Sequence, residues 1–259
     1  MNFTSIHKNI RVVSDVHLEH YNTPPNFRDI ITPGINDILC LLGDIGNPYQ
    51  ELYESFIIWC KQNFSIVLVI AGNHEYYNSS LDSTNNLIEK ICNRNGAFFL
   101  NNSVFIDKNL AFLGTTLWTY VPKIAAKEVE NYLNDYRFIQ GLTIETNNNM
   151  HRECVDFLEN SLKQLKDNYK LIVLSHHSPS LSGTSYPHYE QRLTNFGFSS
   201  DQSNLIKKVD LWMYGHTHYN HPGNVFYKYD TPLVCNQRGY VGRFSSNYNK
   251  DFVIKVNYD

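Results

Sequence analysis

Four short apolar runs in this chain each lead directly into residues that can bind a metal ion or move a proton. The residues that follow the runs are Asp15-Val16-His17, Gly43-Asp44, Gly72-Asn73-His74-Glu75 and Gly215-His216-Thr217-His218. Apolar, β-prone runs of this kind are typical of strands covered on both faces. Sites in open α/β sheets lie beyond the carboxyl ends of such strands. The pattern therefore favours an α/β fold in which these polar residues meet at one edge of a sheet.

Strand-like and helical segments alternate along the first part of the chain, which predicts parallel βαβ units. The expected strands are residues 10–14, 38–42, 65–70, 110–114, 171–175 and 209–214. Apolar residues recur at helical spacing over 52–60 and 155–165, and these stripes are expected to belong to the core. The run Asn147-Asn148-Asn149 is expected to be a loop that leads into the second of these helices.

The chain after Tyr214 changes to short strands separated by turns. These strands are expected at residues 225–229, 232–235 and 252–256, and they look antiparallel. This predicts a mixed sheet rather than a separate domain, and we expect residues 1–259 to form one domain. The stretch 178–203 has no clear period, and a long loop beside a site is often a lid.

The composition is typical of a globular protein, with 42% apolar and 18% charged residues. The formal net charge is −3, so no global basic field draws the chain to nucleic acid. Five cysteines are scattered singly, which argues against a disulfide framework or a thiolate zinc site. The sequence shows neither a leader-like segment nor a membrane-spanning run. We therefore expect a cytoplasmic protein with no membrane partner.

The spacing of the polar residues points to metal binding. Side chains two residues apart on extended backbone point the same way, so Asp15 with His17, and His216 with His218, can each converge on one point. Carboxylate, imidazole and amide ligands without a thiolate suit first-row divalent or trivalent metals. These residues predict a two-metal hydrolytic site.

The motifs D-x-H, G-D, G-N-H-E, a histidine before Ser-Pro and G-H-T-H, in this order, resemble the calcineurin-like metallophosphoesterase superfamily. The segments 14–19, 113–118, 134–137 and 236–240 also resemble a bacterial and phage branch of it. This resemblance implies an α/β fold of four layers, in which two mixed β-sheets form a sandwich flanked by α-helices.

The resemblance also implies a site for two metal ions, whether Mn, Fe, Zn, Co or Ni. The ligands that it implies are Asp15, His17 and His218 for one ion, Asn73, His176 and His216 for the other, and Asp44 for both. A bridging carboxylate can hold two ions about 3.5–4 Å apart, and a hydroxide shared by both ions would attack phosphorus. His74 is expected to donate a proton to the leaving group or to stabilise the transition state. The alternative is that His74 only holds a phosphate oxygen.

Other polar residues near the motifs are weaker candidates. His176 and His177 compete for one ligand position, and we choose His176 because it directly follows the apolar strand; His177 then orients phosphate or simply packs. Arg137 and Arg238 could contact phosphate, although an exposed arginine or a structural ion pair is the more common outcome. Asp135 could pair with one of these arginines. Glu19, Glu75, Tyr76 and Tyr77 could shape the mouth of the site or belong to the core.

The leading functional hypothesis is metal-dependent hydrolysis of a phosphomonoester, a phosphodiester or a pyrophosphate. One alternative is a non-catalytic binding or scaffold protein on the same fold, but all seven proposed ligands and His74 are present. Another is a nuclease, which would need a basic groove and stacking aromatic residues. Tyrosine and phenylalanine are plentiful, whereas the charge balance supplies no such groove. A small phosphorylated substrate or nucleotide is therefore favoured over nucleic acid.

Overall fold

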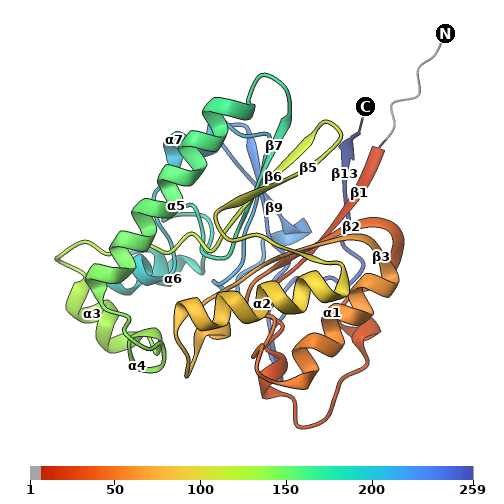
Figure 1. The fold of residues 1–259 in the computed structure, drawn as a ribbon. Helices are drawn as coiled ribbons and strands as arrows, with labels where there is room; N and C mark the ends of the chain where they lie inside the picture. Colours follow the sequence, from red (N-terminus) through yellow and green to blue (C-terminus); the bar gives the residue numbers. More distant parts are fainter. Residues whose placement is uncertain (1–6, 259) are drawn as a thin grey trace.

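The computed structural model describes residues 7–258 and contains two β-sheets between layers of helices (Figure 1). The strands are β1 (His7–Val13), β2 (Gly34–Leu42), β3 (Phe64–Ile70), β4 (Phe98–Phe99), β5 (Ser103–Asp107), β6 (Leu110–Thr115), β7 (Lys170–Ser175), β8 (Leu211–Met213), β9 (Val225–Lys228), β10 (Thr231–Val234), β11 (Gly239–Tyr240), β12 (Arg243–Phe244) and β13 (Ile254–Asn257). The α-helices are α1 (Glu51–Asn63), α2 (Leu81–Asn95), α3 (Ala126–Tyr132), α4 (Asp135–Phe138), α5 (Ile144–Leu165), α6 (Pro187–Glu190) and α7 (Ser203–Ile206). The 3-10 helices are η1 (Leu18–His20), η2 (Phe27–Asp29), η3 (His74–Tyr76), η4 (Leu193–Gly197) and η5 (Pro222–Asn224).

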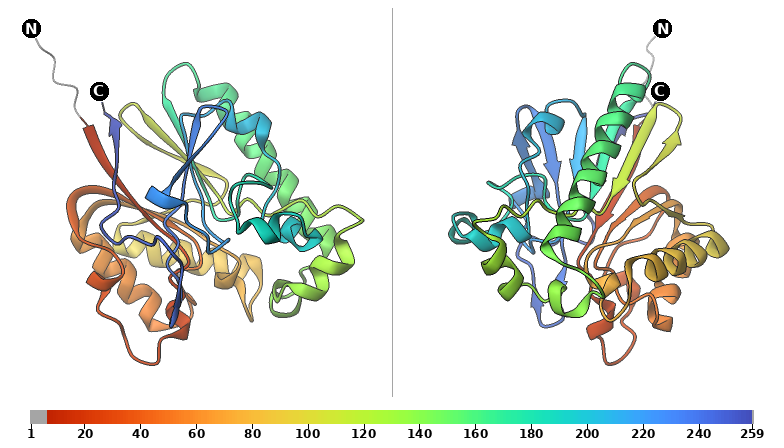
Figure 2. Two further views of the ribbon diagram at one scale, coloured as in Figure 1. Left: turned by 180° about the vertical axis from the view of Figure 1, so that it is seen from behind. Right: turned by 60° about the vertical axis from the view of Figure 1, so that its left-hand side comes forward.

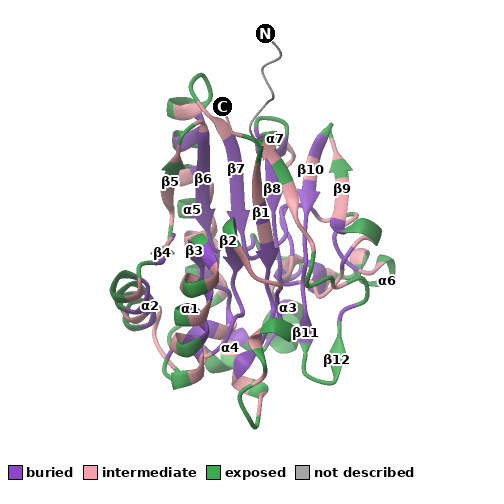
Figure 3. Cartoon of the chain, turned by 90° about the vertical axis from the view of Figure 1, so that its right-hand side faces the viewer, coloured by how far each residue is buried: buried purple, intermediate pink, exposed green. Residues whose placement is uncertain are grey.

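Both large sheets are mixed. In the five-stranded sheet, β1, β2, β3 and β4 are parallel neighbours and β13 pairs with β1 in the opposite direction. In the six-stranded sheet, β6, β7, β8 and β10 are parallel, while β5 and β9 are antiparallel edge strands. Strands β11 and β12 form a separate hairpin; β12 is exposed (Figure 3), whereas Gly239 of β11 is buried. The predicted α/β fold with two mixed sheets is confirmed.

Alternate residues of the central strands face different layers, which explains why these strands are almost entirely apolar. Val12 and Leu42 pack between the sheets with Met213 of the other sheet. Val13 and Leu41 face the opposite way, into the core beneath the helices. Helices α1 and α2 cover the five-stranded sheet and α5 covers the six-stranded one, so the molecule has four layers (Figure 2).

Two sequence expectations about this framework are wrong. The Asn147-Asn148-Asn149 run lies inside α5 rather than in a loop, because a capping box at Thr143 starts that helix earlier. Asn147 then donates a hydrogen bond to the carbonyl of Thr119 at 2.7 Å, which fixes the chain after β6. In the tail after β8, β13 is antiparallel to β1 and β9 is antiparallel to β10, but β10 is parallel to β8. The chain first forms the edge strand β9 and then reverses, which places β10 between β9 and β8.

A small cap lies beyond the carboxyl ends of the strands; it consists of α3, α4, α6 and η4 (Figure 2). It has its own apolar cluster, in which Val129 and Leu133 are packed by Phe196 and Phe198. Gly197 allows a close approach at this contact: a Cβ there would lie 2.2 Å from Cδ1 of Leu133, so the Leu133 side chain would have to shift. The segment 178–203, which lacked a clear period, is therefore an ordered wall with short helices and hydrogen bonds of its own.

The five cysteines are buried free thiols, in agreement with the sequence expectation. Within residues 7–258, the search for a helix long and apolar enough to cross a membrane found none.

Candidate metal centre

Five of the predicted metal ligands have left-handed backbone conformations, which residues other than glycine rarely adopt. The φ values are 54° at Asp15, 52° at His17, 51° at Asp44, 71° at His216 and 51° at His218. Strands β1 and β8 end before these residues, so extended backbone does not aim the side chains, contrary to the expectation from their spacing. His216 and His218 consequently belong to different clusters. Strain of this kind persists only where surrounding structure enforces it, and it is typical of functional sites.

Asp15, His17 and His218 form the first of two clusters that could hold a metal ion. The Nε2 atoms of His17 and His218 are 3.2 Å apart, and Nε2 of His218 lies 3.2 Å from Oδ1 of Asp15. Two nitrogens bound to one metal at about 2.1 Å each would lie about 3 Å apart. Burial raises the pKa of the Asp15 carboxyl, but its contacts with His218 outweigh that effect and leave the pKa below its usual value.

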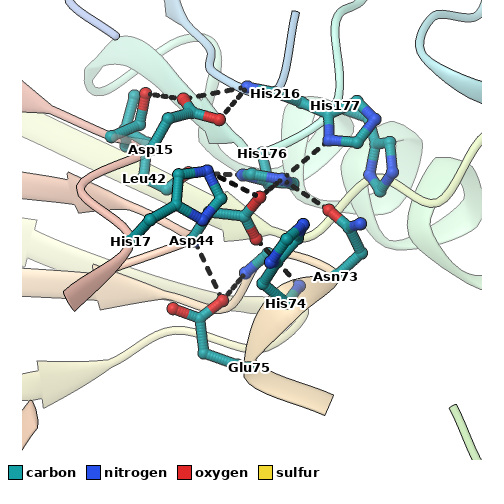
Figure 4. Close-up of polar contacts among 12 residues, drawn as sticks. Asp15, His17, Leu42, Asp44, Asn73, His74, Glu75, His176, His177 and His216 are labelled. Carbon is teal, nitrogen blue, oxygen red and sulfur yellow. Dashed lines mark hydrogen bonds and ion pairs between the residues drawn. The ribbon is translucent and has the colours of Figure 1, made fainter. Parts of the chain in front are cut away.

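Asp44, His176 and His216 form the second cluster, and Asn73 lies against it (Figure 4). Nε2 of His176 lies 3.1 Å from Nδ1 of His216, 3.0 Å from Oδ1 of Asn73 and 3.4 Å from Oδ2 of Asp44. Nδ1 of His176 donates to the carbonyl of Leu42 at 2.8 Å, which leaves its Nε2 free to bind a cation. Burial lowers the pKa of His176, but the carboxylate of Asp44 outweighs it and raises the pKa to about 9. This cluster therefore attracts a positive charge.

The donor atoms of the two clusters fit a pair of metal ions. They are carboxylate oxygens, imidazole nitrogens and one amide oxygen, a set that suits first-row transition metals. Oδ2 of Asp44 lies between the clusters, 3.4 Å from Nε2 of His176 and 3.9 Å from Nε2 of His17. Nε2 of His17 faces Nε2 of His218, and Nε2 of His176 faces Nδ1 of His216. Buried acceptors that face one another need a cation or a donor between them, and a metal ion would satisfy this requirement.

Two glycines let the loops that carry Asp44 and Asn73 approach each other. A Cβ on Gly43 would lie 2.4 Å from the backbone nitrogen of Gly72, and a Cβ on Gly72 would lie 2.3 Å from Oδ1 of Asp44. The buried carboxylate of Glu75 joins the same loops, since it accepts hydrogen bonds from the N–H groups of Asp44 at 2.9 Å and Gly72 at 2.8 Å. Burial raises the pKa of Glu75 to about 7. Glu75 is therefore a structural link beneath the clusters rather than a residue of the mouth.

His74 lies beside the two clusters and is held by Glu19. Nδ1 of His74 is 3.1 Å from Oε1 of Glu19, and the same oxygen is 3.0 Å from Nδ1 of His17. Nε2 of His74 then points to the hydroxyl of Tyr240, 3.4 Å away. Burial lowers the pKa of His74, but the charges of Asp44 and Glu19 outweigh it and raise the pKa to about 9. His74 therefore lies at the edge of the site, and it lines the cavity beside the clusters.

Glu19 also belongs to a third group of possible metal donors, with His17, His20 and His74. Burial raises the pKa of Glu19, but hydrogen bonds from His17 and His74 outweigh it and lower the pKa to about 2. The anion therefore accepts from two imidazoles and fixes which nitrogen of each ring is free. The position of Glu19 two residues after His17 made it a candidate in the sequence. Its contact with His74 was not apparent, because His74 lies on a different loop.

The structure brings His176, and not His177, into the second cluster. Nδ1 of His177 donates to the carbonyl of Thr116 at 3.1 Å, and its ring packs beside Trp118. Burial lowers the pKa of His177 to about 3, so it is a neutral packing residue at ordinary pH.

The two arginine candidates lie away from the clusters. Arg137 is exposed and donates to the carbonyl of Asn131 at 2.7 Å. Arg238 is buried against aromatic rings and donates to the hydroxyl of Tyr21. Asp135 pairs with neither: its Oδ1 accepts from Nδ2 of Asn73 at 2.7 Å, which turns the amide oxygen of Asn73 towards His176. No motif or spacing in the sequence predicted this contact.

A cavity of about 530 Å³ opens beside the clusters. Its inner end is lined by Asp44, Asn73, His74, His216 and His218. Its outer walls come from the cap and from the β11–β12 hairpin, which contributes Tyr240 and Arg243. Neither Arg137 nor Arg238 lines it, and Arg243 is a cavity residue that sequence reasoning missed.

Comparisons with known proteins agree with this geometry. Residues 8–220 match the family described as calcineurin-like phosphoesterase. An uncharacterized protein of Acanthamoeba polyphaga mimivirus is 31% identical over 260 residues, which cover 89% of this chain and 91% of that protein.

Two solved structures share the fold at low sequence identity. Phosphopantetheinyl hydrolase from Mycobacterium tuberculosis has a TM-score of 0.73 and 14% identity, with 98% of this chain and 97% of that chain covered. A dimetal phosphatase from Danio rerio has a TM-score of 0.54 and 11% identity, with 97% and 99% covered. With the family match over most of its length, this chain belongs to the calcineurin-like phosphoesterase family.

Proposed function

We propose that this protein is a dinuclear-metal phosphoesterase that hydrolyses a small organic phosphate, by cleavage of a monoester, diester or pyrophosphate bond. The observation that supports this proposal is the meeting of two donor clusters, a shared carboxylate at Asp44 and the proton-bearing His74 in one cavity. The two solved structures of this fold are described as a phosphopantetheinyl hydrolase and a dimetal phosphatase, which favours the same class of reaction.

The proposal assigns the cluster residues to two ions, with the metal identities left to Mn, Fe, Zn, Co or Ni. The ligands are Asp15, His17 and His218 for the first ion, Asn73, His176 and His216 for the second, and Asp44 for both. When bound, such ions supply an activated water and polarise phosphoryl oxygens.

The remaining chemistry falls to side chains that do not bind metal. Nε2 of His74 carries the proton that the leaving oxygen needs, and Glu19 holds the ring so that this nitrogen faces the cavity. Asp135 holds the amide of Asn73 in its ligating orientation. Tyr240, whose ring stacks on that of His17 with centroids 4.2 Å apart, closes the site on the hairpin side.

The competing functions are less well supported. A scaffold protein would not need His74 to be poised by Glu19 beside complete donor clusters. A nuclease would need a track of cations, and Arg243 is the only lysine or arginine among the described residues that line the cavity. Because both sheets supply ligands, the proposal treats residues 1–259 as one domain. The buried free cysteines fit a reducing compartment such as the cytoplasm.

The first experiment compares hydrolysis of 4-nitrophenyl phosphate and bis(4-nitrophenyl) phosphate by the Mn-loaded protein, with Asp44→Asn as the control. Activity that disappears in the control is expected, and the ratio of the two rates separates a diesterase from a monoesterase. Bound metal without turnover of either ester would contradict the proposal and favour a binding protein.

His74→Ala tests the proton-donor role. We expect a loss of about 10²–10⁴-fold in kcat with normal metal content, and a larger loss for esters with poor leaving groups. Equal losses for good and poor leaving groups would show that His74 stabilises charge instead of donating a proton.

A further inference from the structure

The cavity is much larger than the clusters that open into it. Its volume of about 530 Å³ falls in the range of about 300–1,000 Å³ that holds drug-sized ligands. An inorganic phosphate beside the metal ligands would occupy only its inner end. The outer part, between α3 and the η4 segment, is therefore available to the organic group of the substrate.

An aromatic path leads from the metal centre into this outer part. The ring of Phe198 lies 4.9 Å from that of the proposed ligand His216, and 6.4 Å from the ring of Tyr132 on α3. Phe198 and Tyr132 both line the cavity, and Tyr189 of α6 lines it as well. Aromatic faces of this kind hold a planar ring of a ligand by stacking.

The wall that carries Phe198 is held by its own hydrogen bonds. Asn195 of η4 lines the cavity and is 3% exposed, and its Nδ2 donates to the carbonyls of Leu181 at 3.0 Å and Glu190 at 3.4 Å. The N–H of Phe198 donates in turn to the carbonyl of Asn195 at 2.9 Å. These contacts keep Phe198 in place on the cavity wall.

The charges around the cavity limit how anionic the ligand can be. Arg243 is the only cationic lysine or arginine in the described lining, and Asp135 is a second carboxylate beside Asp44. The metal ions can balance one phosphate group. Further phosphates in the outer part would have only Arg243 to face, which disfavours polyphosphates and polynucleotides.

Resting on the proposed function, we propose that the outer cavity is a subsite for the ring-bearing organic group of a nucleoside-sized phosphoester, stacked on Phe198. The substrate is then a small phosphate ester with one uncharged, ring-containing group.

The test measures binding of phosphonates, whose carbon–phosphorus bond the enzyme cannot hydrolyse, to the Mn-loaded protein by calorimetry. The probes are the phosphonate analogue of a nucleoside 5′-monophosphate, benzylphosphonate and ethylphosphonate. We expect the nucleoside analogue to bind at least about ten-fold tighter than ethylphosphonate. Benzylphosphonate should fall between them, because its single ring can stack but fills less of the outer cavity than a nucleoside does.

Phe198→Leu should reduce the preference for the nucleoside analogue by about five-fold or more, while ethylphosphonate binding stays unchanged. Tyr132→Leu changes a more exposed ring on the same path. It tests the same preference for the nucleoside analogue if Phe198→Leu disturbs the cap. Tyr227→Leu is the matched control, since Tyr227 is 68% exposed on β9 and does not line this cavity.

Equal affinity for the nucleoside analogue and ethylphosphonate would overturn the subsite. Equal affinity for the nucleoside analogue and benzylphosphonate would overturn the nucleoside size of the subsite. Hydrolysis of 4-nitrophenyl esters without a nucleoside preference would leave the proposed function in place and remove only the subsite. A nucleoside preference in a protein that hydrolyses no ester would instead remove the proposed function.

Discussion

The loops that carry the donor clusters and the cap meet at one cavity, but they are built in different ways. Asp15, His17 and Asp44 lie directly after central strands and are 1% exposed or less. The cap presents half-exposed side chains, such as Tyr132 at 55% and Tyr189 at 40%, on helices of seven and four residues. Helices this short are not stable alone, so the cap depends on its small apolar cluster.

From this difference we expect the loops to serve the proposed chemistry and the cap to serve the proposed choice of ligand. The ligand loops are locked by two whole sheets and by buried carboxylates, and they can hold strained backbone without losing their geometry. We therefore expect local changes in the cap to leave the donor clusters in place. Substitutions in the two regions should therefore affect different quantities, metal content in one and ligand preference in the other.

The largest effect is expected from Asp44→Asn. The variant should lose metal from both positions, because the carboxylate is proposed to bridge them, and activity should fall by more than the ~10–100-fold typical of a residue that only supports a ligand. Metal content is measured by mass spectrometry after exhaustive dialysis. Asp156→Asn, an exposed aspartate on α5, is the control. An unchanged metal stoichiometry would remove the bridging role.

A smaller loss is expected from Glu19→Gln. The neutral amide can no longer accept charge-assisted hydrogen bonds from both His17 and His74, so activity or metal affinity should fall about 10–100-fold. Separate measurement of kcat and of metal affinity shows which imidazole is affected more, since kcat reports on His74 and metal affinity reports on His17. Glu145→Gln, at an exposed site on α5, serves for comparison. A change of less than two-fold would make Glu19 a residue of the rim, as the sequence alone allowed.

The ligand loops were largely predictable from the sequence and the cap was not. Short motifs after apolar runs single out Asp15, Asp44 and His176, and the structure brings these side chains into the donor clusters, because each residue closely follows its strand in the chain. Glu75 and Asp135 were not predictable in their roles, because they act on backbone N–H groups or on Asn73 through contacts between distant segments.

The cap was missed for a related physical reason. Its helices are too short to show an apolar period, and they are ordered by Gly197 packing on Leu133 across a gap of more than sixty residues in sequence. The same contact places Phe198 and Asn195 on the cavity wall. Sequence patterns report local periodicity, whereas this wall exists only through tertiary packing.

Val129→Ala tests whether the cap is independent of the metal centre. Removing two methyl-sized groups from the cap cluster should cost about 2 kcal/mol of local stability. Amide exchange should then accelerate in 121–142 and 178–203, while metal content remains that of the unmodified protein. Val67→Ala in β3 is the contrasting variant, because it weakens the sheets that carry the ligands. Loss of metal in Val129→Ala would show that the two regions form one cooperative unit.

The smallest effect is expected from pH, through His151. This residue of α5 donates from Nδ1 to the carbonyl of Trp118 at 2.7 Å, at the start of the chain that leads into the cap. Burial lowers the pKa of His151 below its ordinary value of 6.5, and the nearby Arg152 acts in the same direction.

The unfolded chain therefore binds this proton more readily than the native state does, so stability is complete above pH 6.5 and is lost as pH falls from there through the lowered native pKa. Between pH 7.5 and 5.5, amide exchange near residues 116–125 should increase. His151→Gln, which can still donate to Trp118, should show a smaller increase. Since the metal-ligand histidines are the same in both proteins, the difference between them isolates His151. Parallel pH profiles would mean that acid loosens the metal centre first and the cap only follows.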